Sequence, residues 1–286
     1  MEAPSGIIRS DSEMKKYVLL ILVLCAFSFY AAEHFAEKQT LRIGVECDYA
    51  PNNWLEDHQT DTNLPIVNEP GHYAEGYDIQ IAKLVAEEMN AVLEVRKFGW
   101  NELIPALARR EIDAVFSGML DTQDRHKNAD FSDTYDVAKT EYTIVVNRAS
   151  PYADAETLSD FSGARLVAQN GTTLDKAIAQ ISGAVHLPPV STVQDMLNMV
   201  VNNKADGTVI NLDTGQSYER KHSNLKLIRF PEGEGFHLDF NGICAGVRKG
   251  NTKLLNDINA ALAKISRRER NRLMDRAVIR TLTVLP

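Results

Sequence analysis

Residues 77–116 read YDIQIAKLVAEEMNAVLEVRKFGWNELIPALARREIDAVF and switch repeatedly between two hydrophobic periodicities. Apolar residues recur at helical spacing over 77–90 and again over 101–110. The stretches 91–97 and 112–116 instead have the alternating or continuous apolar pattern of strands. Strands that alternate with helices predict βαβ units and a mainly parallel sheet.

The same alternation continues on both sides of this stretch. Residues 41–45 (LRIGV) predict a strand before it. After it, strands are expected at 141–147, 164–168, 207–212, 225–230 and 242–248, and helices near 172–181, over 190–203 and up to Ile265. Two similar α/β units are therefore predicted, with the last strand and helix left over.

The composition is that of a folded protein with two domains. The chain has 286 residues, of which 44% are hydrophobic and 24% are charged. These values exclude a disordered chain and a polytopic membrane protein. The net charge of −8 argues against nucleic acid as a partner. The basic stretch Lys264–Arg280 is read as a solvated helix face, with docking to an acidic partner as the alternative.

The N-terminal segment 1–39 predicts export. Residues 17–32 carry no charge and follow Lys15-Lys16, which is the pattern of a signal peptide. The chain has two candidate start residues, Met1 and Met14. The apolar run is shorter than a comfortable membrane span. An uncleaved anchor and a lipid anchor at Cys25 remain alternatives. Each of them places the remainder in the periplasm or on the outer face of the cytoplasmic membrane.

Common catalytic signatures are absent from the sequence. There is no nucleophile elbow, P-loop, zinc-protease motif or dinucleotide fingerprint. The seven histidines are scattered, and we expect neither a metal nor a cofactor. Cys47 and Cys244 are expected to be buried thiols, with a disulfide between them as the alternative.

A series of short motifs carries a family resemblance. In order they are Gly76-Tyr77-Asp78, Trp100-Asn101-Glu102-Leu103-Ile104-Pro105-Ala106-Leu107, Glu111-Ile112-Asp113-Ala114, Thr122-Gln123-Asp124-Arg125 and Asp130-Phe131-Ser132-Asp133-Thr134-Tyr135. The series resembles the polar amino-acid group of extracytoplasmic binding proteins of bacterial ABC importers. That resemblance covers about residues 40–286 and implies the two-lobed periplasmic-binding-protein (Venus flytrap) fold. Lobe one would contain 40–140 and 233–286, lobe two 141–232, and two hinge strands would cross between them.

The resemblance also implies ligand contacts. Arg125 matches the arginine that holds the α-carboxylate of the ligand, a role that suits a guanidinium group. Ser117 and Gly118 match further donors to that carboxylate. Thr172 and Thr173 match the corresponding loop of lobe two, where Gln169 is also assigned to the site. Taken alone, Arg125 is also read as a surface arginine and the Thr172 loop as a helix cap.

Aromatic and acidic residues are assigned to the side chain of the ligand. Tyr49 and Trp100 match an aromatic pair that encloses it, and Trp54 stands where an aromatic shapes the first loop. Glu46 lies where members that bind lysine or arginine carry an acid, which favours a cationic ligand. Ordinary core positions for the aromatics and a solvated loop acid at Glu46 are the alternatives.

Two positions depart from the family pattern. Asn211 stands where a carboxylate usually pairs with the α-ammonium group, with Asp213 two residues later. Either another acid substitutes, or the amino group of the ligand is absent or differently held. Leu120 replaces a usual Thr or Ser and removes a hydroxyl from the carboxylate pocket.

The sequence therefore predicts a monomeric, non-enzymatic solute-binding protein. It would capture an arginine-, lysine- or glutamine-like amino acid by hinge closure and deliver it to an ABC permease in the inner membrane. One alternative is a prephenate-type dehydratase on the same fold, because the departure at Asn211 leaves room for cleft chemistry. A second alternative is the ligand-binding domain of a sensor.

Overall fold

A computed structural model describes residues 16, 18–23, 38–136, 140–240 and 242–284. The chain divides into two units, Met1–Gln39 and Thr40–Pro286. In the first unit, residues 16 and 18–23 are helical, and the rest of the apolar segment predicted for export lies outside the described residues. Within these described ranges, no helix combines the length and the apolar character that a membrane span requires.

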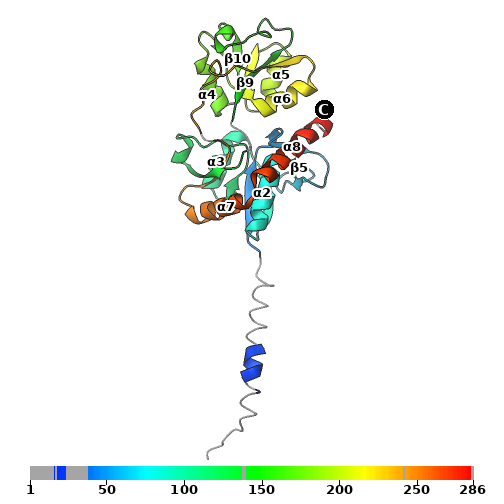
Figure 1. Ribbon diagram of the computed structural model, residues 1–286, viewed down its shortest axis with the longest axis vertical. Helices are drawn as coiled ribbons and strands as arrows, with labels where there is room; N and C mark the ends of the chain where they lie inside the picture. Colours follow the sequence, from blue (N-terminus) through cyan, green and yellow to red (C-terminus); the bar gives the residue numbers. More distant parts are fainter. Residues whose placement is uncertain (1–15, 17, 24–37, 137–139, 241, 285–286) are drawn as a thin grey trace, which may run out of the picture. The chain divides into compact units, whose positions relative to one another are not determined.

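The second unit contains two five-stranded sheets, which Figure 1 shows in separate groups of elements. The first sheet has the order β6-β1-β7-β14-β8. Its strands are β1 (Thr40–Val45), β6 (Val92–Lys97), β7 (Ala114–Val115), β8 (Ala129–Thr134) and β14 (Cys244–Arg248). Strand β1 pairs in parallel with β6 and β7, whereas β14 is antiparallel to β7 and β8.

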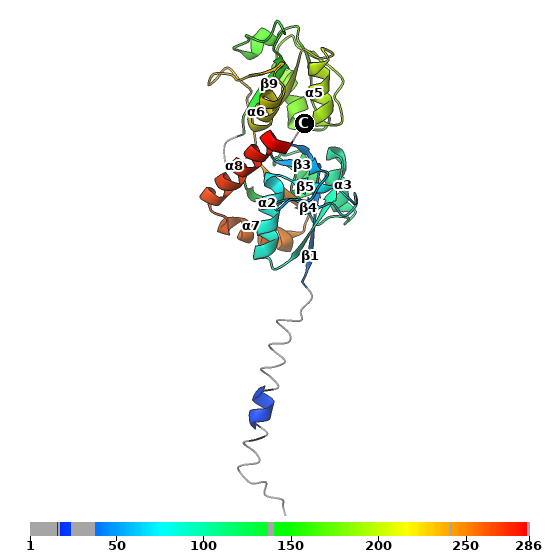
Figure 2. The same cartoon turned by 90° about the vertical axis from the view of Figure 1, so that its right-hand side faces the viewer.

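Helices cover both faces of this sheet. Figure 2 shows α2, α7 and α8 together on one side and α3 on the other. Their bounds are α2 (Tyr77–Glu88), α3 (Leu103–Ala108), α7 (Thr252–Lys264) and α8 (Arg267–Val284), and a 3-10 turn, η1 (Trp100–Glu102), precedes α3. Ile43 and Val45 on β1 are fully buried, as are Ile81 and Val85 on α2. The apolar periodicity of the sequence thus forms a core between sheet and helices.

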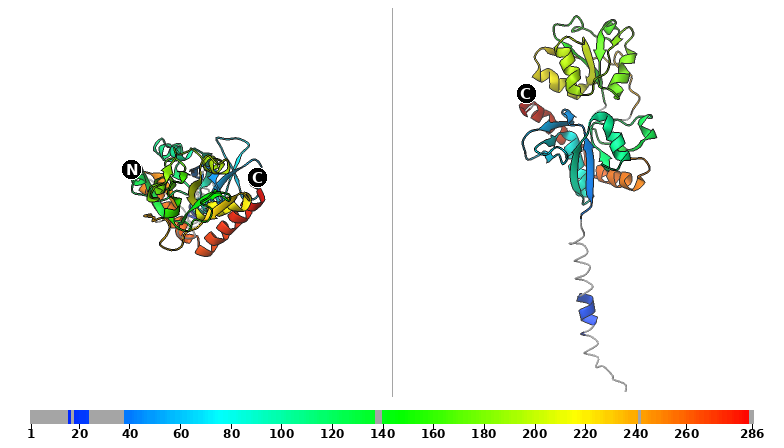
Figure 3. Two further views of the ribbon diagram at one scale, coloured as in Figure 1. Left: turned by 90° about the horizontal axis from the view of Figure 1, so that it is seen from above. Right: turned by 180° about the vertical axis from the view of Figure 1, so that it is seen from behind.

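The second sheet has the order β11-β10-β12-β9-β13. Its strands are β9 (Tyr142–Asn147), β10 (Arg165–Val167), β11 (Val185–His186), β12 (Gly207–Asn211) and β13 (Leu225–Ile228). The accompanying helices are α4 (Thr173–Ala177), α5 (Val193–Val201) and α6 (Leu212–Lys221), with 3-10 turns η3 (Leu158–Phe161) and η4 (Ile178–Gln180). Figure 3 shows this green and yellow group apart from the blue, cyan and red elements of the first sheet.

A small antiparallel sheet follows β1 and is not evident from the hydrophobic pattern. Its order is β2-β3-β5-β4. The strands are β2 (Asp48–Tyr49), β3 (Asn53–Glu56), β4 (Leu64–Pro65) and β5 (Tyr73–Glu75). They are too short for an alternating pattern to be recognised. This sheet leads the chain from the end of β1 to the start of α2.

The predicted strands and helices are present, with differences at their ends. Residues 101–110 form a 3-10 turn and a short helix instead of one helix, and the basic C-terminal stretch is the long helix α8. The sheets are mixed because β9 and β14 enter antiparallel. The segments between β8 and β9 and between β13 and β14 carry no strand in their described residues.

Cys47 and Cys244 are buried free thiols, so they do not form the alternative disulfide.

The start of α2 depends on Gly76. This residue has φ 124° and ψ 179°, a conformation open only to glycine, and it occupies the N-cap position without a side-chain cap. Asp78 follows two residues later, and its buried side chain lies in the first turn of the helix. The backbone N–H of Asp78 donates to the Asn52 carbonyl at 2.8 Å. Gly76 thus lets the helix begin against the small sheet.

The substitution Gly76→Ala should destabilise the protein. A Cβ atom there would lie 2.3 Å from the Asn52 carbonyl oxygen. The alanine would also have to adopt a φ of 124°, which residues with a side chain rarely adopt. We expect the free energy of unfolding to fall by about 2–4 kcal/mol, measured by urea denaturation. Gly99→Ala is the matched control, because Gly99 has φ −62° and no atom within 4 Å of an added Cβ. Equal stability of the two variants would contradict this account.

Candidate functional site

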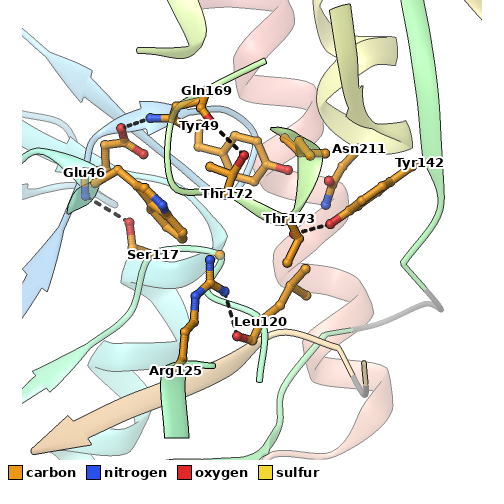
Figure 4. A pocket seen from close by; sticks show the side chains of 13 residues that line it. Glu46, Tyr49, Ser117, Leu120, Arg125, Tyr142, Gln169, Thr172, Thr173 and Asn211 are labelled. Carbon is orange, nitrogen blue, oxygen red and sulfur yellow. Dashed lines mark hydrogen bonds between the residues drawn. The ribbon is translucent and has the colours of Figure 1, made fainter. Parts of the chain in front are cut away.

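A pocket lies between the two five-stranded sheets, among the loops at the ends of their strands. Its empty space is about 370 Å³ when the part open to solvent is included, and it is lined by Glu46, Tyr49, Trp100, Ser117, Gly118, Leu120, Arg125, Tyr142, Gln169, Thr172, Thr173, Leu174 and Asn211. Figure 4 shows these side chains. Several of them follow the carboxyl ends of strands β1, β7, β10 and β12. Open α/β sheets bind ligands at this edge, where loops and helix N-termini meet.

Arg125 supplies the positive charge of the pocket. It lies on the 3-10 turn η2 (Arg125–Lys127), and its Nη1 donates to the Leu120 carbonyl at 2.7 Å. Its Cζ lies 5.0 Å from the centroid of the Trp100 ring. Burial lowers the pKa of Arg125 to about 10, which still leaves it charged at neutral pH. Among the described residues no carboxylate forms an ion pair with Arg125, although the charge of Asp121 raises its pKa, so its remaining donors can bind an anion.

Glu46 supplies a buried carboxyl group. Its backbone N–H donates to Ser117 Oγ at 3.0 Å, which fixes the loop after β1. Its side chain accepts hydrogen bonds from Gln169 Nε2 and from the backbone of Trp100. Burial and then the charge of Asp48 raise the pKa of Glu46 to about 8, although these hydrogen bonds lower it. Glu46 is therefore largely protonated at neutral pH until a cation compensates it.

Aromatic rings form the walls of the pocket. The indole Nε1 of Trp100 donates to the Gly171 carbonyl at 3.2 Å, and the Tyr142 hydroxyl is bonded to Thr173 Oγ1. The Tyr49 ring packs against Gly118, which has φ +61°. A Cβ atom at Gly118 would lie 3.0 Å from that ring, so the site requires glycine there.

The loop after β10 is held by Thr172. Its hydroxyl donates to the Gln169 carbonyl at 2.6 Å and accepts from the Asp175 N–H at 3.2 Å, as the N-cap of α4. Gln169 Nε2 also donates to the Ser191 carbonyl at 3.0 Å. Thr172 therefore has the capping role that the sequence suggested, and it lines the pocket as well.

Asn211 is the last residue of β12 and the N-cap residue of α6. Its side chain makes no capping hydrogen bond, and it lines the pocket. Asp213 is in the first turn of α6 and is not among the lining residues. Burial raises the pKa of Asp213. The neutral amide, and not the nearby acid, therefore borders the pocket.

Comparison with known proteins identifies the family. Residues 41–277 match the bacterial extracellular solute-binding proteins, family 3. The chain belongs to this family. Its fold is accordingly the two-lobed fold of the periplasmic binding proteins.

Individual relatives of this solute-binding protein cover most of its length. The ABC transporter arginine-binding protein 1 of Escherichia coli is 30% identical over 258 residues, 88% of this chain and 93% of that protein. An arginine-binding extracellular protein of Bacillus subtilis is 25% identical over 260 residues, with coverages of 88% and 93%. A crystal structure of the substrate-binding protein of an amino acid ABC transporter has 26% identity and a TM-score of 0.69, covering 83% of this chain and 98% of that one.

The structure brings together most of the residues that the sequence assigned to ligand binding. Eleven of the twelve line the pocket. Trp54 does not: it is 2% exposed on β3, and its indole donates to Glu56 Oε1 at 2.8 Å. Tyr142 and Leu174 line the pocket but were not assigned to it. Tyr142 is the second residue of the strand predicted over 141–147, and Leu174 follows the Thr172-Thr173 loop. Nothing in the sequence beyond these positions indicated that they line the pocket.

Several contacts join the two sides of the pocket. Besides the Gln169–Glu46 and Trp100–Gly171 bonds, Asp48 Oδ2 accepts the Val193 N–H at 2.8 Å at the start of α5. A helix N-terminus favours a negative charge at this place. The exposed Lys176 Nζ and Asp124 Oδ2 also pair at 2.5 Å. Residues that follow β1 thus contact both α5 and the loop after β10.

The two tryptophans should report differently on the pocket. The chain has only Trp54 and Trp100, so each conservative variant leaves one indole. In Trp54→Phe, we expect acrylamide to quench the remaining Trp100, and a bound solute to change its emission. In Trp100→Phe, the buried Trp54 should be protected from acrylamide and unresponsive to the solute. A solute response that persists in Trp100→Phe would remove Trp100 from the site.

Proposed function

We propose that the protein captures an amino acid with a cationic side chain, and that the pocket binds both this cation and the carboxylate of the ligand. The observation that supports this most directly is that one aromatic-walled pocket contains the charged Arg125 and the carboxyl group of Glu46, which a bound cation would ionise. Oppositely charged groups orient such a ligand, and the rings provide apolar and cation–π contact. The arginine-binding names of two similar proteins agree with a cationic ligand.

The carboxylate of the ligand is assigned to Arg125. The guanidinium presents parallel donors that suit a carboxylate, and Ser117 and Gly118 line the pocket beside it. Thr172 and Thr173 would approach from the loop after β10, where α4 begins. The backbone N–H groups at this helix start would add donors for the same anion.

The cationic end of the ligand is assigned to Glu46. Gln169 now holds this carboxyl group, and a cation would replace or share that contact. Because an adjacent positive charge stabilises the ionised form, binding would lower the pKa of Glu46 and release a proton.

Capture would proceed by closure of two lobes, residues 40–140 with 233–286 and residues 141–232. The contacts of Asp48 with α5 and of Trp100 with Gly171 would form as the lobes close. Shifting a closed state from 1% to 99% needs about 5.5 kcal/mol of differential binding. A ligand with a micromolar dissociation constant has a binding free energy of about 8 kcal/mol, which is sufficient for this shift.

The closed protein would deliver its ligand outside the cytoplasm to an ABC permease in the inner membrane. The relatives support this location, because they are named as extracellular or periplasmic proteins. Residues 1–39 would act as the signal peptide or as a membrane or lipid anchor, and the protein would act as a monomer.

Replacing Arg125 should abolish binding. In Arg125→Ala the carboxylate would lose its charged partner in a buried pocket, so we expect no measurable heat of arginine binding in calorimetry. Arg109→Ala is the control, because Arg109 is an exposed arginine paired with Glu111. Its affinity should equal that of the unchanged protein. Retained binding in Arg125→Ala would exclude Arg125 from the site.

The affinity for arginine should rise with pH between 6 and 8. Since the free pKa of Glu46 is about 8 and binding lowers it, a lower pH opposes binding, by up to about tenfold per unit. Two neighbouring charges act on the pKa of Glu46: Asp48 raises it and Lys97 lowers it. Calorimetry in two buffers of different ionisation enthalpy should detect the released proton.

Glu46→Gln tests this assignment directly. The variant should lose the pH dependence and bind arginine at least about tenfold more weakly, because a neutral amide replaces the carboxylate. Glutamine affinity should change little. An unchanged arginine affinity would contradict the role of Glu46.

A further inference from the structure

We propose that the pocket prefers cationic carboxylic acids without an α-ammonium group, namely ω-guanidino and ω-amino acids. This inference rests on the proposed function and specifies its ligand class. The observation behind it is a count of charges. Among the residues that line the pocket, Glu46 is the only carboxylate and Arg125 the only permanent cation. Arginine and lysine bring three charges to a pocket that offers partners for two.

The two groups contact different parts of Trp100. Its backbone donates a hydrogen bond to the Glu46 carboxyl group, and its ring lies beside the Arg125 guanidinium. Figure 4 shows Glu46 next to Gln169 and Arg125 next to Leu120. An α-ammonium group is attached to the carbon that carries the carboxylate. It would therefore stay near Arg125 and away from Glu46.

The surroundings of Arg125 offer an ammonium group little compensation. Leu120 presents an apolar side chain, and its carbonyl already accepts from Arg125. The Thr172 hydroxyl is bonded on both its donor and its acceptor side. The side chain of Asn211 offers an amide oxygen but no charge.

Two acids close to the pocket are engaged elsewhere, and a third lies outside its lining. Asp121 pairs with His126 at 2.5 Å, and Asp48 accepts from the start of α5. Asp213 lies outside the lining. A buried ammonium group without a carboxylate loses hydration that neutral acceptors replace only in part. A ligand without that group avoids this cost and keeps both strong contacts.

The test compares L-arginine with 5-guanidinopentanoate, which differ only in the α-amino group. Calorimetry on the purified protein at pH 7 should give an affinity for 5-guanidinopentanoate higher by on the order of tenfold. Asn211→Asp should invert this preference, because it adds a second carboxylate to the lining of the pocket, which could pair with the α-ammonium group. Aspartate is a good N-cap residue, so α6 should keep its start. Asn211→Ser is the neutral control and should keep the original preference.

The outcomes separate this inference from the proposed function. If L-arginine binds as tightly as 5-guanidinopentanoate or more tightly, the inference is overturned while the proposed function stands. If Asn211→Asp folds with an unchanged melting temperature and leaves the ratio of affinities unchanged, the count of charges around Asn211 is wrong and the inference is likewise overturned. If neither compound binds the unchanged protein, the proposed function fails as well.

Discussion

The buried carboxylate of Asp78 is the interaction on which the first half of the pocket depends. It accepts hydrogen bonds from Asn53 Nδ2 at 2.7 Å and from the Tyr135 hydroxyl at 2.6 Å, and a further one from the backbone of Gly118. Burial raises its pKa to about 6, while these hydrogen bonds favour the ionised form. Its place in the first turn of α2 also suits a negative charge. Asn53 in turn accepts the backbone N–H of Cys47, so one carboxylate fixes the loops that carry Glu46 and Gly118.

The opposite side of the pocket has fewer such internal constraints and is held by contacts across it. Thr172 orders its own loop as a helix cap, but Gln169 and Gly171 find partners in Glu46 and Trp100. Asp48 at the start of α5 adds a charge-assisted contact. The exposed pair of Lys176 and Asp124 adds little, because water screens it. The two sides of the pocket are thus joined mainly by polar contacts that lie next to it.

Much of this architecture could be predicted from the sequence, because its elements are local. The apolar periods over 77–90 and 91–97 became α2 and β6 with ends shifted by one or two residues. The small sheet β2-β3-β5-β4 could not be predicted, because its strands are too short for a period and pair only through tertiary packing. The antiparallel direction of β14 depends on how the chain returns to the first sheet after β13. No local sequence pattern predicts that direction.

The sequence by itself determined the family, the alternation of strands and helices and most residues of the pocket, because motif order and hydrophobic period are properties of neighbouring positions. Only the tertiary structure separated Trp54 from Trp100, since both are aromatic residues in loop-like sequence and differ only in what packs around them. It also decided that Glu46 is buried and that Asn211, not Asp213, borders the pocket. Burial and charge balance arise from residues distant in the chain, and they are what give a binding pocket its chemistry.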